Sequence, residues 1–184
     1  GYALDDEAGV YRQESGSNYW GDSNIRDWLN SDASAGNVVW SCGNPPDKDH
    51  IWGSCNTYAQ EAGFLNNFTE DERAAIKTVT QKQLLDGYEH SSSINENYHL
   101  PSYYIKDILQ NYDTAYSETT TDKVFLLDVK QAYNLYNDFG DYYKAYCTSK
   151  AVENSECSSE DISTDSYCYY WLRSPDAHFS GDIV

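Results

Sequence analysis

The sequence predicts a loop-rich α+β domain with a few short helices and a small mixed or antiparallel sheet. Three observations support this class. Helix-capping residues recur at wide intervals, short apolar runs of strand length stand apart, and Gly, Pro, Ser and Asn fill the long stretches between them. The 184 residues suffice for a single domain, and because only 40% of them are hydrophobic we expect a modest core.

The first expected helix begins after Ser23 and ends at Asn30. Serine is a favoured N-cap because its hydroxyl accepts a hydrogen bond from a free backbone amide of the first turn. Ile25, Trp28 and Leu29 follow at i, i+3 and i+4, so they share one face of the helix. Asparagine is among the residues that end helices, and the helix is therefore expected to be short.

Two later segments carry a capping box, in which an N-cap side chain and a residue three positions on cap each other. Thr69 with Glu72 opens one predicted helix, and Asp128 with Gln131 opens a longer one that Gly140 would end. The longer helix is expected to turn four residues toward the core: Ala132, Leu135, Tyr136 and Phe139.

Strands are expected at three places. The purely apolar run over 124–127 has the length and composition of a buried strand, and it is the clearest strand pattern in the chain. Residues 78–85 and 167–173 are weaker candidates. The long polar stretch over 86–121 is interpreted as an insertion into the domain, since long irregular stretches commonly carry binding surfaces.

The formal net charge of -18 argues against nucleic acid as a partner, because phosphates would be repelled. It suits a basic partner or calcium, although a well-solvated surface is a better explanation of the charge than a dedicated cation site. The sequence also contains no run near the ~20 apolar residues of a membrane-spanning helix, so membrane insertion is not expected.

The five cysteines are widely spaced, which argues against a zinc site. Cys42 and Cys55 flank one polar loop, and Cys147 and Cys157 flank another. We expect two local disulfides that close these loops, with Cys168 left over, which would place the protein outside the cytoplasm. The alternative is that all of them are free, partly buried thiols.

Tyrosine is unusually abundant, with 18 residues. An apolar ring with a polar tip covers a binding surface at low entropic cost, and aromatic rings also stack on sugars. We therefore expect a ligand-binding role for the tyrosines of the predicted insertion, or else a role in packing it onto the body: Tyr98, Tyr103, Tyr104, Tyr112 and Tyr116.

Four motifs in a fixed order resemble an uncharacterised bacterial family, a domain of unknown function common in secreted and surface proteins. They are SxIRxWLN over 23–30, FxxxExxxI over 68–76, DKVFLL over 122–127 and WLRSP over 171–175. The family is distantly similar to the C-type-lectin-like fold of formylglycine-generating enzymes. The resemblance implies a mixed α+β fold whose loops form the ligand face. It also implies that this chain lacks the flanking strands of the full domain.

In the family pattern two arginines accompany core tryptophans, here Arg26 with Trp28 and Arg173 with Trp171. A buried guanidinium carries five N–H donors and can tie several loop carbonyls together. We therefore expect these four residues to be structural.

An enzymatic alternative rests on Cys168. The run over 166–169 resembles the Ser-Tyr-Cys-Tyr run of formylglycine-generating enzymes, which hold copper between two thiolates. The expected position of the second thiolate is occupied by Ser163, and a single thiolate makes a poor copper site. Catalytic residues of this type are therefore not expected.

Acidic residues make calcium the second candidate ion. Acidic residues gather near the end of the chain, but without the spacing of an EF-hand: Asp161, Asp165, Asp176 and Asp182. We expect no cofactor and no metal site, with calcium as the ion that the acids would suit.

Together these features favour an extracellular or cell-surface binding module that recognises a protein or a glycan through tyrosine-rich loops. The two alternatives are an oxidase of the formylglycine-generating type and a structural spacer of a larger surface protein.

Overall fold

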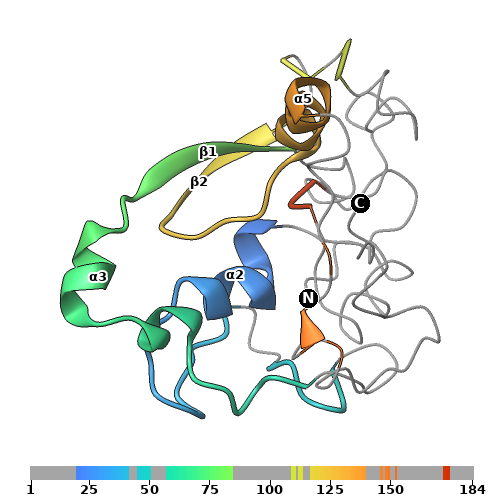
Figure 1. Ribbon diagram of the computed structural model, residues 1–184. Coiled ribbons are helices and arrows are strands. Elements are labelled where there is room, and N and C mark those ends of the chain that lie inside the picture. The colour runs from blue at the N-terminus through green and yellow to red at the C-terminus, as the bar shows by residue number, and fades with distance from the viewer. Residues whose placement is uncertain are drawn as a thin grey trace.

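The computed structural model describes residues 20–41, 45–50, 57–84, 109–110, 112–113, 117–139, 146, 148–149, 152 and 172–174. Over these ranges the chain forms a small α+β fold of short helices and one two-stranded antiparallel sheet (Figure 1). Its elements, in chain order, are the 3-10 helix η1 (Trp20–Asp22), α2 (Asn24–Leu29), the 3-10 helix η3 (Phe64–Asn67), α3 (Glu70–Ala75), β1 (Val79–Leu84), β2 (Ser117–Asp122) and α5 (Val129–Phe139).

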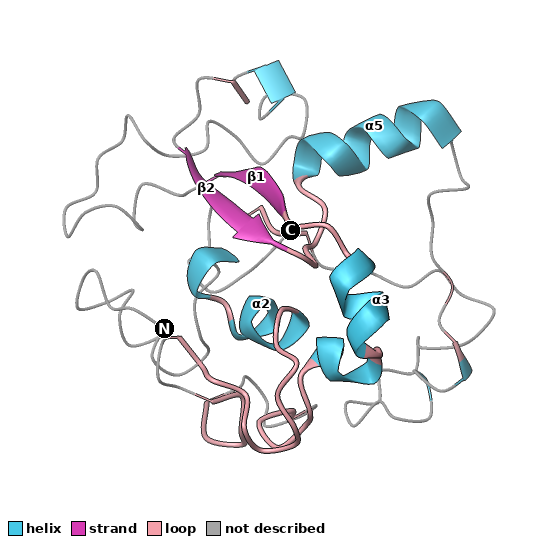
Figure 2. Cartoon of the chain, turned by 90° about the vertical axis from the view of Figure 1, so that its left-hand side faces the viewer, coloured by secondary structure: helices cyan, strands magenta, loops and turns pink. Residues whose placement is uncertain are grey.

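The sheet joins two polar strands that are far apart in the sequence. β1 pairs with β2 in antiparallel register, from Val79 opposite Asp122 to Leu84 opposite Ser117. The prediction of a strand near 78–85 is confirmed. β2 was not predicted, and most of it lies inside the stretch that the sequence suggested was an insertion. Both views place α2 below this sheet, and α3 leads directly into β1 (Figures 1 and 2).

The predicted strand over 124–127 is wrong. Residues 123–128, which we call the connector, form an irregular segment between β2 and α5. Side chains bond to several of its backbone groups, and the carbonyl of Leu127 accepts the backbone amide of Arg173 at 2.9 Å. The Asn30 side chain holds the amides of Lys123 and Val124, and Arg173 holds the carbonyl of Leu126. An apolar run therefore need not join a sheet when other groups of the fold satisfy its peptide N–H and C=O groups.

The three predicted caps are confirmed. The Ser23 hydroxyl accepts a hydrogen bond from the third amide that follows it, and α2 ends at Asn30. α3 begins with a complete capping box, in which the Thr69 amide donates to the Glu72 carboxylate at 2.7 Å. The amide of Gln131 donates to the carboxylate of Asp128 at 2.7 Å, and the Asp128 amide donates back to the Gln131 side chain.

The core face predicted for α5 is correct only at its beginning. Val129 is buried and Ala132 packs against the core, whereas Tyr136 is 49% exposed and Phe139 is 56% exposed. The prediction was wrong for these two aromatic residues because α5 meets the body through its first turns. Figure 2 shows the helix extending away from the sheet.

One small hydrophobic cluster brings together four separate parts of the chain: Leu84, Tyr112, Val129 and Leu172. Each belongs to a different segment, so the cluster packs β1, the start of α5 and the chain near residues 112 and 172 against one another.

None of the helices within the described ranges is long and apolar enough to cross a membrane.

A second, aromatic cluster packs α2 against the loops that follow it. The Trp28 ring lies 5.5 Å from Phe64 and 6.2 Å from Tyr58, centroid to centroid, and its indole N–H donates to the carbonyl of Ala62 at 2.9 Å. Gly63 lies beside this contact, where a Cβ atom would come within 2.2 Å of a backbone oxygen. Only glycine allows the two loops to approach this closely.

Candidate functional site

The connector begins beside a buried carboxylate, that of Asp122, the last residue of β2. One oxygen accepts the indole N–H of Trp20 at 3.0 Å, and the other accepts Nε of Arg26 at 2.7 Å. The same arginine also donates to the carbonyl of Gly21 at 2.8 Å. We call Trp20, Arg26 and Asp122 the Asp122 cluster. It ties η1 and α2 to the end of the sheet.

Asn30 fixes the first part of the connector. Its amide group donates to the carbonyls of Arg26 and Val124, and its side-chain oxygen accepts the amides of Lys123 and Val124 at 2.8 and 3.1 Å. One side chain thus satisfies backbone groups at the end of α2 and at the start of the connector. These bonds give Asn30, the last residue of the SxIRxWLN motif, a physical role.

The connector ends at a second buried carboxylate, that of Asp128. Its partner Arg173 is 1% exposed, and the two side chains form an ion pair of 3.0 Å. The guanidinium also donates to oxygens of Gln81 (3.3 Å), Lys82 (3.1 Å), Leu126 and Gln131 (2.8 Å). Burial lowers the pKa of Arg173, while the charge of Asp128 opposes that shift.

Tyr112 completes what we call the Asp128 cluster, with Asp128 and Arg173. Its hydroxyl donates to Asp128, and the ammonium groups of Lys82 and Lys130 lie 4.8 and 4.4 Å from its ring centroid. The side chain is 7% exposed, which is the packing placement that the sequence left as the alternative to ligand binding. Burial, followed by the hydrogen bond to Asp128, raises the pKa of Tyr112.

The structure brings only some of the predicted residues together. Arg26 belongs to the Asp122 cluster, Arg173 to the Asp128 cluster and Trp28 to the aromatic cluster. The other predicted site residues lie outside the described ranges: Tyr98, Tyr103, Tyr104, Tyr116, Trp171, Cys42, Cys55, Cys147, Cys157 and Cys168.

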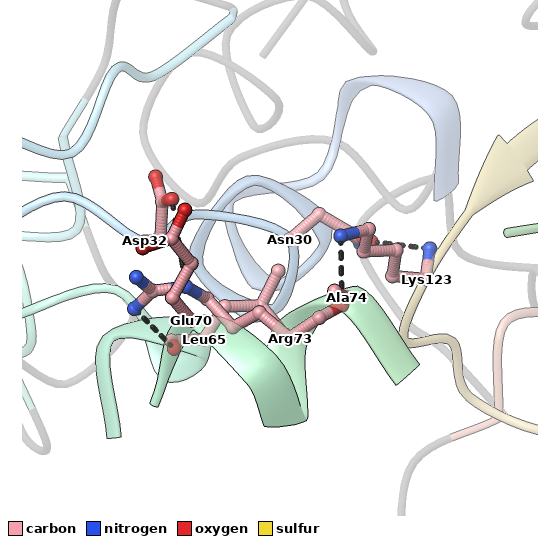
Figure 3. A pocket seen from close by; sticks show the side chains of 7 residues that line it. All are labelled: Asn30, Asp32, Leu65, Glu70, Arg73, Ala74 and Lys123. Carbon is pink, nitrogen blue, oxygen red and sulfur yellow. Dashed lines mark hydrogen bonds and ion pairs between the residues drawn. The ribbon is translucent and has the colours of Figure 1, made fainter. Parts of the chain in front are cut away.

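A surface pocket of about 390 Å³ lies where α3 faces the end of α2 and the connector (Figure 3). Charges of both signs meet in it, so we call it the mixed-charge pocket. Its lining consists of Asn30, Asp32, Leu65, Glu70, Arg73, Ala74 and Lys123.

Sequence reasoning missed this pocket, because no motif joins its residues. The capping box at Thr69 does place Glu70 and Arg73 on one short helix. Asp32 and Lys123, however, reach the pocket only through the fold.

In the part of the chain that the structure describes, no group of three or more His, Cys, Asp or Glu side chains could hold a metal ion. His50 forms a pair with Asp47 at 2.7 Å, and both side chains are partly exposed. The acids that suggested calcium, which lie over 161–182, fall outside the described residues.

The fold and its clusters define a class of small α+β domain in which buried side-chain networks hold irregular segments. Comparison by sequence gives this class a family: the chain belongs to the domain of unknown function DUF6273, whose family model matches residues 2–184. The match confirms the expectation of an uncharacterised domain family. No curated protein and no solved structure matches the chain.

Proposed function

We propose that this domain is an extracellular binding module with a C-type-lectin-like fold, which recognises a protein or a glycan through tyrosine-rich loops. One observation carries the proposal. Leu84 and Ser117 are paired in the sheet, so the two ends of the stretch over 85–116 join the body at neighbouring positions. A long stretch whose two ends are fixed by paired strands has a rigid base, which suits recognition.

The placement of Tyr112 adds to this argument. Its side chain anchors the last part of the stretch in the core, so the base of the stretch is fixed at three points with Leu84 and Ser117. Tyr98, Tyr103 and Tyr104 precede this anchor in sequence. We assign them, with Tyr116, to the ligand face, and Tyr112 to its support.

The way in which buried charges are used also favours binding over catalysis. In both clusters the arginine and the carboxylate hold backbone groups and other side chains of the fold. Such networks keep irregular segments in fixed positions, as a surface made of loops requires. The charge of -18 favours a neutral or basic ligand over an anionic one.

The proposed location is outside the cell, with disulfides between Cys42 and Cys55 and between Cys147 and Cys157. Peptide mapping of the secreted protein without reducing agent tests this pairing. Two cross-linked peptides are the expected result. Free thiols at all four positions would contradict it.

Binding is tested by comparing two variants with the unchanged protein on a glycan array and in a pull-down from cell-surface extract. The first variant combines Tyr98→Ser, Tyr103→Ser and Tyr104→Ser. The matched control is Tyr133→Ser, an exposed tyrosine on α5. The proposal expects a specific ligand whose signal falls in the triple variant and persists in the control.

Equal binding by all three proteins would overturn the role of the tyrosines. If no ligand is retained from either source, the binding function itself fails, and the structural spacer becomes the better explanation. Copper-dependent oxygen consumption by the unchanged protein would instead support the oxidase.

A further inference from the structure

The mixed-charge pocket offers both hydrogen-bond donors and hydrogen-bond acceptors. Arg73 and Lys123 supply the cationic donors, and Asp32 and Glu70 supply the anionic acceptors (Figure 3). Leu65 and Ala74 supply the apolar part of the lining. We propose that this pocket is a subsite for a neutral saccharide. The inference rests on the proposed function, because it assigns the glycan to a place on the domain.

The donors are held in position by the backbone. Nη1 of Arg73 donates to the carbonyl of Phe68 at 2.9 Å, and more weakly to that of Leu65 at 3.4 Å. Nζ of Lys123 donates to the carbonyl of Arg73 at 3.1 Å. The guanidinium of Arg73 and the ammonium of Lys123 therefore each use only some of their N–H bonds within the fold. A guanidinium has five N–H bonds and an ammonium three, so donors remain for a ligand.

The acceptors are more accessible than the donors. The Asp32 side chain is 68% exposed, and its contact with Nε of Arg73 is a long one, at 3.9 Å. Glu70 is exposed in the first turn of α3. Its neighbours Thr69 and Glu72 form the capping box, so the helix turn that carries it is fixed. Both carboxylates can thus accept hydrogen bonds without breaking a strong internal one.

A sugar hydroxyl matches this lining because it donates one hydrogen bond and accepts others. Neighbouring hydroxyls can donate to a carboxylate and accept from a guanidinium at the same time, and such charge-assisted bonds are about twice as strong as neutral ones. The C–H face of a sugar ring suits the exposed side chain of Ala74, whereas Leu65 is only 4% exposed and forms the floor beneath it. A saccharide with acidic groups is disfavoured, because the domain carries a net charge of -18.

The size of the pocket agrees with this class of ligand. Its volume of about 390 Å³ falls in the lower part of the range of small-molecule sites, which is roughly 300–1,000 Å³. A second hollow of about 490 Å³ shares Asn30 and Asp32 with it. A saccharide of more than one unit could therefore extend past Asp32 without leaving a polar surface.

The test uses the full chain on an array of neutral oligosaccharides, followed by calorimetric titration with the oligosaccharide that gives the strongest signal. The pocket variant combines Asp32→Asn with Glu70→Gln, which keeps the shape of both side chains. The matched control, Asp71→Asn, removes one charge from the same turn of α3 outside the pocket. We expect the pocket variant to bind at least ~10-fold more weakly and the control to bind normally.

Three results would overturn the inference: no neutral oligosaccharide binds, the pocket variant binds as the unchanged protein does, or the control loses as much affinity as the pocket variant. The triple tyrosine variant separates this failure from that of the proposed function. Binding that depends on the tyrosines and not on the pocket removes the subsite and leaves the proposed function intact. Binding that depends on the pocket alone supports the subsite and removes the tyrosine loops as the ligand face.

Discussion

The Asp122 and Asp128 clusters are built alike and differ in their contact with water. In each, one carboxylate is shared between an arginine and an aromatic donor, Trp20 in the first and Tyr112 in the second. The Arg26 side chain is 25% exposed, whereas the Arg173 side chain is 1% exposed. The connector runs from one cluster to the other, so the two act on opposite ends of the same segment.

The difference shows which arginine the fold depends on more. Arg26 donates to two residues, and water can reach part of its side chain. Arg173 donates to five residues from β1, the connector and α5. A buried ion pair adds little stability relative to an apolar replacement of both partners, but the loss of one partner leaves a buried charge uncompensated.

The largest expected effect therefore follows from Arg173→Leu. This change leaves Asp128, which is 2% exposed, without its cation, and leaves the Lys82 and Leu126 carbonyls without this donor. We expect a loss of about 3–5 kcal/mol in the free energy of unfolding, enough to unfold much of a marginally stable domain. Urea denaturation followed by tryptophan fluorescence measures it.

Arg173→Lys is the companion variant, because it keeps the charge but not the planar group that reaches several acceptors. It should fold with a stability between those of the unchanged protein and the leucine variant. If the leucine variant were as stable as the unchanged protein, the Asp128 cluster would not be what holds the connector.

Arg26→Leu should have the same kind of effect at the other end, but a smaller one. Asp122 keeps the indole N–H of Trp20, and water can enter where the guanidinium was. We expect a loss of about 2 kcal/mol, measured in the same urea titration. A loss equal to that of Arg173→Leu would contradict the assignment of unequal roles to the two arginines.

Alkaline pH should distinguish the clusters, because tyrosine titrates and tryptophan does not. An unfolded tyrosine loses its proton near pH 10, whereas burial and the bond to Asp128 keep Tyr112 protonated above that pH in the folded protein. The unfolded state then binds fewer protons, so stability falls as the pH rises above about 10.

Tyr112→Phe tests this directly. At pH 7 the variant should be less stable by about 1 kcal/mol, because Asp128 loses a donor. Between pH 9 and 11 the unchanged protein should lose more stability than the variant, so the two curves approach each other. The stability of the variant still falls somewhat as the pH rises, because burial also raises the pKa of Tyr58. Parallel curves would show that Tyr112 does not contribute to alkaline unfolding.

The caps of this fold could be predicted because a cap is a local interaction. Ser23, the Thr69 box and the Asp128 box each satisfy amides within three residues, so their pattern is visible in the sequence. β2 could not be predicted in this way. Its run SETTTD has no apolar alternation, and it pairs with β1 across a separation that no local pattern reveals.

The connector shows the opposite failure, in which a strong local pattern gave the wrong element. Val124 and Leu126 are residue types that favour strands, but the side chains of Asn30 and Arg173 bond to their backbone groups in place of a neighbouring strand. The sequence indicated that Arg173 would be structural and did not indicate its partners. The mixed-charge pocket was missed for the same reason, since Asp32 and Lys123 meet only once the fold is formed.

The smallest expected effect concerns Gln83, a buried polar side chain of β1 that belongs to neither cluster. Gln83 is 0% exposed, and neither its side-chain nitrogen nor its oxygen has a hydrogen-bond partner among the residues that the structure describes. A buried amide without partners costs free energy, so removing it should cost little or nothing, unlike removing a residue of either cluster.

Gln83→Met keeps the length of the side chain, and we expect it to be neutral or to stabilise the domain by up to about 1 kcal/mol. The same titration measures it beside Arg26→Leu. Thr120→Val removes the Thr120 hydroxyl, which also lacks a hydrogen-bond partner within the described ranges, and serves as an independent check on the same sheet. If Gln83→Met destabilises the domain as much as Arg26→Leu does, the amide is hydrogen-bonded in solution, and this part of the sheet holds a third polar cluster. A neutral result means that buried polar groups stabilise this fold only where they are paired, as they are at the two ends of the connector.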